Sequence, residues 1–190
     1  MYHIRNDKRA KKSAELIADA VMKLASRKSY ADITITDIEK ASTVARSTFY
    51  RLFDNTTDVL AYLCDRTFDE LTGIHALHLN EGIRSVMLLT GEYWMQHKRL
   101  LEVIDKAGYQ NILMESFSRH YPLILSYCFP EADQVPGAGS EYAVSIAVSL
   151  ISSSLLTWAR TGQKESAEEL SDIIVNVLEK MTELFTEAAM

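Results

Sequence analysis

Apolar residues recur at intervals of three and four positions along most of the chain, which is the period of an amphipathic helix. The first run predicts a helix over residues 8–27 with one buried stripe. Later runs predict helices over residues 57–71, which Gly73 can close, and over residues 81–97, 99–107, 109–127 and 142–159. A last helix is predicted with apolar positions from 170 to 185. Three prolines and seven glycines in 190 residues also favour helices over strands and turns. The chain is therefore predicted to be all-α.

Two short helices are predicted ahead of residue 54. Thr34 and Asp37 form a capping box at the start of a helix over residues 35–41. The apolar pattern breaks at Thr43, which leaves room for only a tight turn before a third helix over residues 45–53. Two short helices joined by so few residues describe a helix-turn-helix.

The third helix carries the chemistry of DNA recognition. Residues 42–53 include two arginines and a tyrosine and no acidic residue, although the chain has a net charge of −6. Base edges in the major groove are read by donors and small side chains, and phosphates are bound by cations, hydroxyls and helix N-termini. The predicted base contacts are Arg46, Ser47 and Thr48, and the predicted phosphate contacts are Thr34, Thr36, Tyr50 and Arg51.

Charge is divided unevenly between the two parts of the chain. Residues 1–54 hold 11 Lys and Arg against 7 Asp and Glu, whereas residues 55–190 hold 9 against 19. A basic leading segment on an acidic body indicates that only the N-terminal part meets a polyanion. On charge alone, a chance fluctuation on a solvated surface is an equal alternative.

The run ITITDIEKASTVARSTFYRLFDNTTDVLAYL resembles the DNA-binding region of TetR-family transcriptional regulators. The residues that match the family pattern are Ile38, Ser42, Val44, Thr48, Phe49, Tyr50, Phe53, Val59 and Leu60. The resemblance covers about a quarter of the chain. It implies a helix-turn-helix DNA-binding domain over residues 1–54 and a helical effector-binding and dimerisation domain over residues 55–190. The implied function is a ligand-responsive regulator, usually a repressor, that binds a palindromic operator as a homodimer.

Four positions depart from the family pattern. Thr43 replaces the usual turn glycine, so a left-handed backbone there would be strained. Ala45 stands where a serine usually caps the recognition helix, and Thr56 replaces a lysine that commonly contacts phosphate. Glu39 replaces a small residue and is expected to be exposed, close enough to the recognition helix to disfavour phosphate contact.

Two helices at the end of the chain have more apolar surface than one small body covers. The uncharged stretch over residues 142–159 and the last helix therefore predict a symmetric four-helix interface between two copies. Burial of both helices inside a monomer is the alternative. The predicted interface residues are Ile146, Leu150, Ile174, Val177, Met181 and Leu184.

The resemblance also implies a mostly apolar ligand cavity in the body. The candidate residues are Tyr93, Trp94, His97, Tyr109, Phe117, Tyr121 and Trp158. For each of them taken singly, a place in the ordinary core is the favoured alternative, because cores use aromatic residues at helical spacing. The alternative that the body binds a protein partner in place of a small molecule stays open. An enzyme is disfavoured because there is no nucleophile and base arrangement, metal signature or cofactor loop, and no cofactor or metal is expected.

Three features of the sequence bear on where the protein is located: its N-terminal residues, its two cysteines and its longest uncharged stretch. The N-terminal residues lack the apolar segment of a signal peptide, and Cys64 and Cys128 have no disulfide or zinc spacing. Residues 142–159 reach the length of a membrane span, but six Ser or Thr residues give that stretch a polar stripe. A cytoplasmic protein without a membrane segment is expected.

Overall fold

The computed structural model describes residues 2–4, 7–78, 82–128 and 139–188, and within these the side chains of 121–128, 139–141, 143 and 181–188 are left aside. This described part is helical, as predicted, with one short 3-10 helix and no strand. The helices are α1 (Lys8–Ala25), η1 (Tyr30–Asp32), α2 (Ile35–Ser42), α3 (Arg46–Leu52), α4 (Thr56–His75), α5 (Gly82–Gln96), α6 (Lys98–Ala107), α7 (Gln110–Cys128), α8 (Gly139–Arg160) and α9 (Ala167–Ala188).

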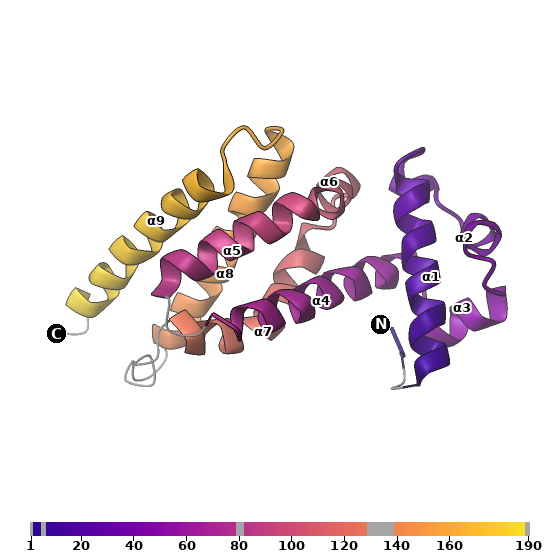
Figure 1. Ribbon diagram of the computed structural model, residues 1–190, viewed down its shortest axis with the longest axis horizontal. Helices are drawn as coiled ribbons and strands as arrows, with labels where there is room; N and C mark the ends of the chain where they lie inside the picture. The colour runs from indigo at the N-terminus through magenta and orange to yellow at the C-terminus, as the bar shows by residue number, and fades with distance from the viewer. Residues whose placement is uncertain (1, 5–6, 79–81, 129–138, 189–190) are drawn as a thin grey trace.

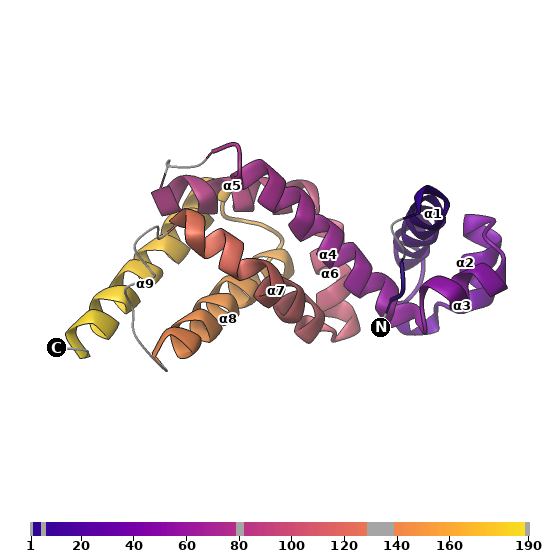
Figure 2. The ribbon, with the colours of Figure 1, turned by 90° about the horizontal axis from the view of Figure 1, so that it is seen from below.

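The molecule is elongated, with α1, α2 and α3 gathered at one end (Figure 1). We call these three helices the head and α4–α9 the body. Helix α4 leads from the head into the body, where α5 and α9 lie side by side (Figure 1) and α7 packs along α4 (Figure 2). The proposed domain boundary after residue 54 falls between α3 and α4.

One continuous apolar core runs through both parts. In the head, α1 is capped by Asp7 and buries Ala14, Ile17, Ala18 and Val21, the stripe set by its three- and four-residue spacing. Helix α4 buries Leu60 and Phe68 on the same principle. Because α4 contributes to the packing of head and body alike, it connects their two interiors.

The predicted end of the fourth helix is wrong. Residues 57–71 were expected to be helical with Gly73 closing the helix, but α4 continues through Gly73 to His75. Gly73 has a helical backbone, and a Cβ atom placed there would meet nothing within 4 Å. Apolar packing of the last turn therefore outweighs the small helix propensity of glycine.

Two sets of side chains join the head to the body. The Tyr30 ring lies edge-on to the Tyr109 ring at 5.9 Å, and its hydroxyl donates to the Thr56 carbonyl at 2.6 Å. Buried Asp65 of α4 accepts hydrogen bonds from Tyr2 at 2.6 Å and from two residues of α7, Ser116 and Arg119. The N-terminal segment, α4 and α7 are thus held together through one carboxylate.

The uncharged stretch that reaches membrane-span length belongs to α8. Its residues Ile151, Leu155 and Trp158 are buried in the body core, and the Trp158 indole donates to the Glu165 carbonyl at 2.9 Å. Among the described residues, no helix combines the length and the apolar character that crossing a membrane requires.

Candidate nucleic-acid interface

The start of α2 is fixed by the capping box that the sequence predicts. The Thr34 hydroxyl accepts from the Asp37 amide at 3.2 Å, and the Asp37 carboxylate accepts from the Thr34 amide at 2.9 Å. Lys28 adds an ion pair to Asp37 at 2.6 Å, and hydrogen bonds from Lys28 and Thr34 hold the pKa of Asp37 below its usual range. These contacts lock the segment between α1 and α2.

The turn between α2 and α3 has the left-handed backbone that the sequence made doubtful. Thr43 has φ 60° and ψ 13°, and its amide donates to the Glu39 carbonyl at 3.0 Å. Val44 follows as a buried anchor, and its amide donates to the Ser42 hydroxyl at 3.1 Å. The turn is therefore as tight as predicted, and it places a β-branched residue in the conformation that favours glycine.

Helix α3 presents one face inward and the other to solvent. Phe49 and Leu52 are buried, and Phe53 closes the helix from inside the core. The residues expected to face DNA lie on the opposite side: Arg46, Ser47, Tyr50 and Arg51 are exposed and Thr48 is half-buried. The apolar anchors thus hold a donor-rich surface outward.

Arg46 and Tyr50 form a pair on this surface. The Arg46 guanidinium donates to the Tyr50 hydroxyl at 3.3 Å and lies 5.5 Å from the ring centroid, within cation–π range. Tyr50 keeps 47% of its surface exposed. The pair restricts two long side chains along α3, which would lower the entropy lost if this face binds a partner.

The N-terminus of α3 has a contact that the sequence did not reveal. Ala45 precedes the helix and provides no side-chain cap, as predicted. The Glu39 carboxylate instead accepts a hydrogen bond from the Arg46 amide at 3.3 Å. Glu39 is half-buried, not simply exposed as expected. The only hint in the sequence is an acidic residue seven positions before an uncapped helix start.

The two predicted phosphate contacts on α2 differ in availability. The Thr34 hydroxyl is engaged with Asp37, to which it also donates at 2.5 Å. Thr36 is exposed in the first turn of α2. A phosphate at this helix end would therefore meet Thr36 and the backbone amides more readily than the Thr34 side chain.

The predicted effector residues lie in the body, mostly within its core. Tyr93, Trp94, Phe117 and Trp158 are buried, His97 and Tyr109 are half-buried, and the side chain of Tyr121 is outside the described residues. Tyr93 stacks on His97 at 4.2 Å and donates to Glu70 at 2.7 Å; burial and this bond raise the pKa of the Tyr93 phenol. The Trp94 indole nitrogen is buried without a hydrogen-bond partner among the described residues.

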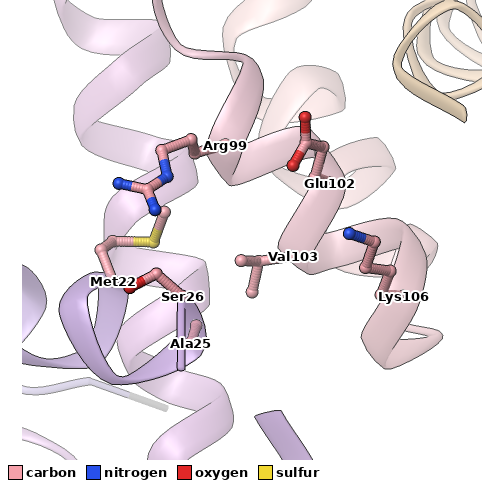
Figure 3. Close-up of a pocket in the computed structure, with 7 residues that line it drawn as sticks. All are labelled: Met22, Ala25, Ser26, Arg99, Glu102, Val103 and Lys106. Atoms are coloured by element: carbon pink, nitrogen blue, oxygen red, sulfur yellow. The ribbon is translucent and has the colours of Figure 1, made fainter. Parts of the chain in front are cut away.

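A cavity of about 180 Å³ lies elsewhere, between the end of α1 and α6 (Figure 3). Its lining consists of Met22, Ala25, Ser26, Arg99, Glu102, Val103 and Lys106, and includes none of the predicted effector residues. The charged groups around it belong to α6, and the apolar floor is shared by both helices. This small space sits at the junction of head and body.

The predicted dimer residues are only partly on the surface. Ile146 and Val177 are 40% and 39% exposed, and Leu150 is half-buried. Ile174 is buried inside the subunit, whereas its neighbour Ile173, which the sequence analysis did not select, is 53% exposed. The side chains of Met181 and Leu184 are outside the described residues.

Taken together, a capped α2, a tight turn and an outward-facing α3 on a helical body define a helix-turn-helix protein. The structure is similar to Lin0861 from Listeria innocua, with TM-score 0.77, 16% identity, and coverage of 94% of this chain and 96% of that one. It is also similar to a TetR transcriptional regulator from Streptococcus agalactiae, with TM-score 0.62, 17% identity, and coverage of 88% and 94%. A third similar structure is DhaS, an activator of the dihydroxyacetone kinase operon, with TM-score 0.61, 20% identity, and coverage of 91% and 97%.

The likeness to solved structures of TetR-family transcriptional regulators shows that the chain has their fold, as its helix-turn-helix motif predicted. No protein-family model matches the sequence, and no curated protein sequence is similar to it.

Proposed function

We propose that this protein is a DNA-binding transcriptional regulator that reads the major groove with α3. The observation that carries the proposal is the outward face of α3, where Arg46, Ser47, Tyr50 and Arg51 are exposed while Phe49 and Leu52 anchor the helix. A helix of this kind fits the major groove, where arginine pairs with guanine and hydroxyls contact several bases. The proposed phosphate contacts are Tyr50, Arg51, Thr36 and the first turn of α2.

The charge distribution supports the same assignment. The first 54 residues carry a net charge of +4 and the remainder carries −10. A polyanion is therefore attracted to the head and repelled by the body, which orients the protein as it approaches DNA.

The test begins with DNA selected from a random pool by the full-length protein, followed by affinity measurements across a salt series. Binding should weaken steeply as salt rises, since phosphate contacts release counterions. Arg46→Ala should weaken binding to selected DNA by about 10- to 100-fold and change the base preference. Tyr50→Ala with Arg51→Ala should weaken binding to all sequences and lower the salt slope by about one to two.

Arg99→Ala is the matched control, because Arg99 is an exposed arginine on α6 of the body. It should bind selected DNA as the parent does. The proposal is wrong if the α3 variants also bind like the parent, or if the parent selects no sequence from the pool.

We also propose that the protein acts as a homodimer on a two-fold symmetric site. Support comes from the exposed apolar side chains of α8 and α9, which include Ile146, Ile173 and Val177. Two copies paired through these helices would hold two heads for two half-sites. Repression is the proposed outcome because a bound dimer excludes other proteins from the promoter; DhaS, by its description an activator, makes a reporter-gene assay the necessary check.

The proposed control of DNA binding is a small molecule received by the body. On the helices of the body, three buried polar atoms have no hydrogen-bond partner among the described residues: His75 Nδ1, Trp94 Nε1 and Ser152 Oγ. Unpaired polar atoms in an apolar core favour a ligand with hydrogen-bonding groups over a hydrocarbon. The DNA-binding assay, repeated with a panel of metabolites, should identify compounds whose effect Trp94→Phe abolishes.

A further inference from the structure

The recognition helix α3 begins without the cap that its own sequence would normally supply. Ala45 has φ −59° and ψ 144°, an extended conformation typical of an N-cap residue, but its side chain has no acceptor. The amides of Thr48 and Phe49 both donate to the Ala45 carbonyl, at 2.9 and 3.1 Å. The Arg46 amide, one residue into the helix, is left to find another partner.

Glu39 of α2 is that partner. The left-handed turn at Thr43 folds α3 back toward α2, so a residue seven positions earlier reaches the Arg46 amide at 3.3 Å. The bond is at the long end of the usual range. A carboxylate at this place is nonetheless favourable, because it also lies at the positive end of the α3 dipole. Glu39 thus stabilises a helix start that Ala45 leaves without a side-chain cap, through the Arg46 amide and not through the amides that a capping serine would bind.

We propose that Glu39 is a positioning residue for the recognition helix and lowers the affinity of that helix for DNA. Its carboxylate holds the first turn of α3, from which Arg46 projects, in a fixed orientation. The same negative charge repels phosphates of every sequence, so it weakens binding to selected and random DNA by the same factor. The second half of this statement rests on the proposed function, whereas the capping role does not.

The capping role is tested without DNA by unfolding and hydrogen exchange. Glu39→Ala should lower the melting temperature by about 2 to 4 °C and speed hydrogen exchange at the Arg46 amide. Ala45→Ser supplies a hydroxyl at the N-cap itself, which accepts from the amide of Ser47 or Thr48 and not from that of Arg46. It should therefore restore stability to the Glu39→Ala protein while exchange at Arg46 stays fast. An unchanged melting temperature or unchanged exchange at Arg46 in Glu39→Ala would overturn the capping role.

The effect of the charge is tested with Glu39→Gln, which keeps an acceptor oxygen and removes the charge. Affinity for selected and for random DNA should both rise on the order of threefold to tenfold, because phosphate repulsion does not depend on sequence. The variant with both Glu39→Ala and Ala45→Ser should show the same rise with restored stability. Unchanged affinity in both variants would overturn the role of the charge.

The two proposals fail in distinguishable ways. If the parent protein binds no DNA, the proposed function and the role of the Glu39 charge fall together, and unfolding and hydrogen exchange still decide whether Glu39 caps α3. If the parent binds DNA and Glu39→Ala changes neither stability nor exchange at Arg46, the proposed function stands and Glu39 is not the cap.

Discussion

Thr43 occupies a backbone conformation that costs a β-branched residue about 1 to 2 kcal/mol, with φ at 60°. The tight connection between α2 and α3 requires this conformation, because Val44 must point into the core directly afterwards. Part of the cost is recovered by local hydrogen bonds, including one from the Thr43 hydroxyl to the Ser42 carbonyl at 2.6 Å. The strain is therefore a consequence of the motif's geometry.

Replacing Thr43 with glycine should raise the melting temperature by about 2 °C. The relief of left-handed strain exceeds the extra freedom that glycine gives the unfolded chain, although the margin is small. Thr36→Gly is the control, since Thr36 is exposed in the first turn of α2 and a glycine there is destabilising. Calorimetry of the two variants would show opposite signs; a loss of stability in Thr43→Gly would contradict the strain argument.

His75 is fully buried at the end of α4 in its neutral form. The Thr90 hydroxyl donates to the Val86 carbonyl at 2.8 Å, so its oxygen accepts from Nε2 of His75 at 3.2 Å. That leaves Nδ1 without a hydrogen, and it has no partner among the described residues. Burial lowers the pKa of His75 to about 4.

Stability should consequently fall as the solution is acidified below the pKa of an unfolded histidine, about 6.5. Between about pH 6.5 and pH 4, the histidine is protonated in the unfolded chain and stays neutral in the folded protein. From pH 7 to pH 5 the parent should lose about 2 kcal/mol more than His75→Gln in urea unfolding, because the other titrating groups are common to both. Equal losses in the two proteins would mean that His75 is not held neutral.

At the scale of helices, predictability follows sequence distance. The start of α2 and the missing cap of α3 were predicted because capping involves residues within three positions. The bond from Arg46 to Glu39 depends on the path of the turn, which residue types alone do not specify. Gly73 was misjudged because tertiary packing overrides local propensity.

No sequence pattern predicts the hydrogen bonds that Asp65 accepts. Its partners on α7 are Ser116 and Arg119, 51 and 54 positions away along the chain. Only the packing of α7 along α4 brings them to the carboxylate, and Tyr2 comes from the N-terminal segment, 63 positions before Asp65. From sequence alone, an aspartate on a helix is predicted to be exposed to solvent, because its neighbours in space are not known.

Asp65→Asn should destabilise the protein by about 2 to 4 kcal/mol. The carboxylate accepts hydrogen bonds from Tyr2, Ser116 and Arg119, whereas the asparagine amide would turn an N–H group toward these donors. The negative charge opposite Arg119 is also lost. Asp69→Asn, one turn further along α4, is the control: Asp69 is 75% exposed and pairs with His120 at 2.9 Å, so the change should cost under about 1 kcal/mol. Similar unfolding free energies for both variants would refute the structural role of Asp65.

For the whole molecule, the head was easier to predict than the surfaces of the body. Periodicity shows that α8 and α9 are apolar, but a helix with apolar residues on several faces does not show which face meets its own subunit. In the structure α9 buries Ile174 inside the subunit and leaves Ile173 exposed. The sequence therefore predicted an interface on these helices, but it could not separate the residues that face their own subunit from those left on the surface.

The last prediction concerns the exposed side of α8 and α9. Ile146→Glu combined with Ile173→Glu should convert a dimer into a folded monomer, because two buried charges per subunit would oppose their own copies across a two-fold interface. Sedimentation equilibrium measures the mass, and Leu16→Glu, at a 38% exposed apolar residue of the head, should remain dimeric.

The monomer should also lose DNA affinity without any change to the reading surface. In a dimer, binding of the first head raises the local concentration of the second to about millimolar, which strengthens binding to a two-fold site by 100-fold or more. The variant should bind a symmetric site no more tightly than a single half-site, and its circular dichroism should match the parent's. A variant that stays dimeric, or that keeps the preference for symmetric sites as a monomer, would place the subunit contact somewhere other than α8 and α9.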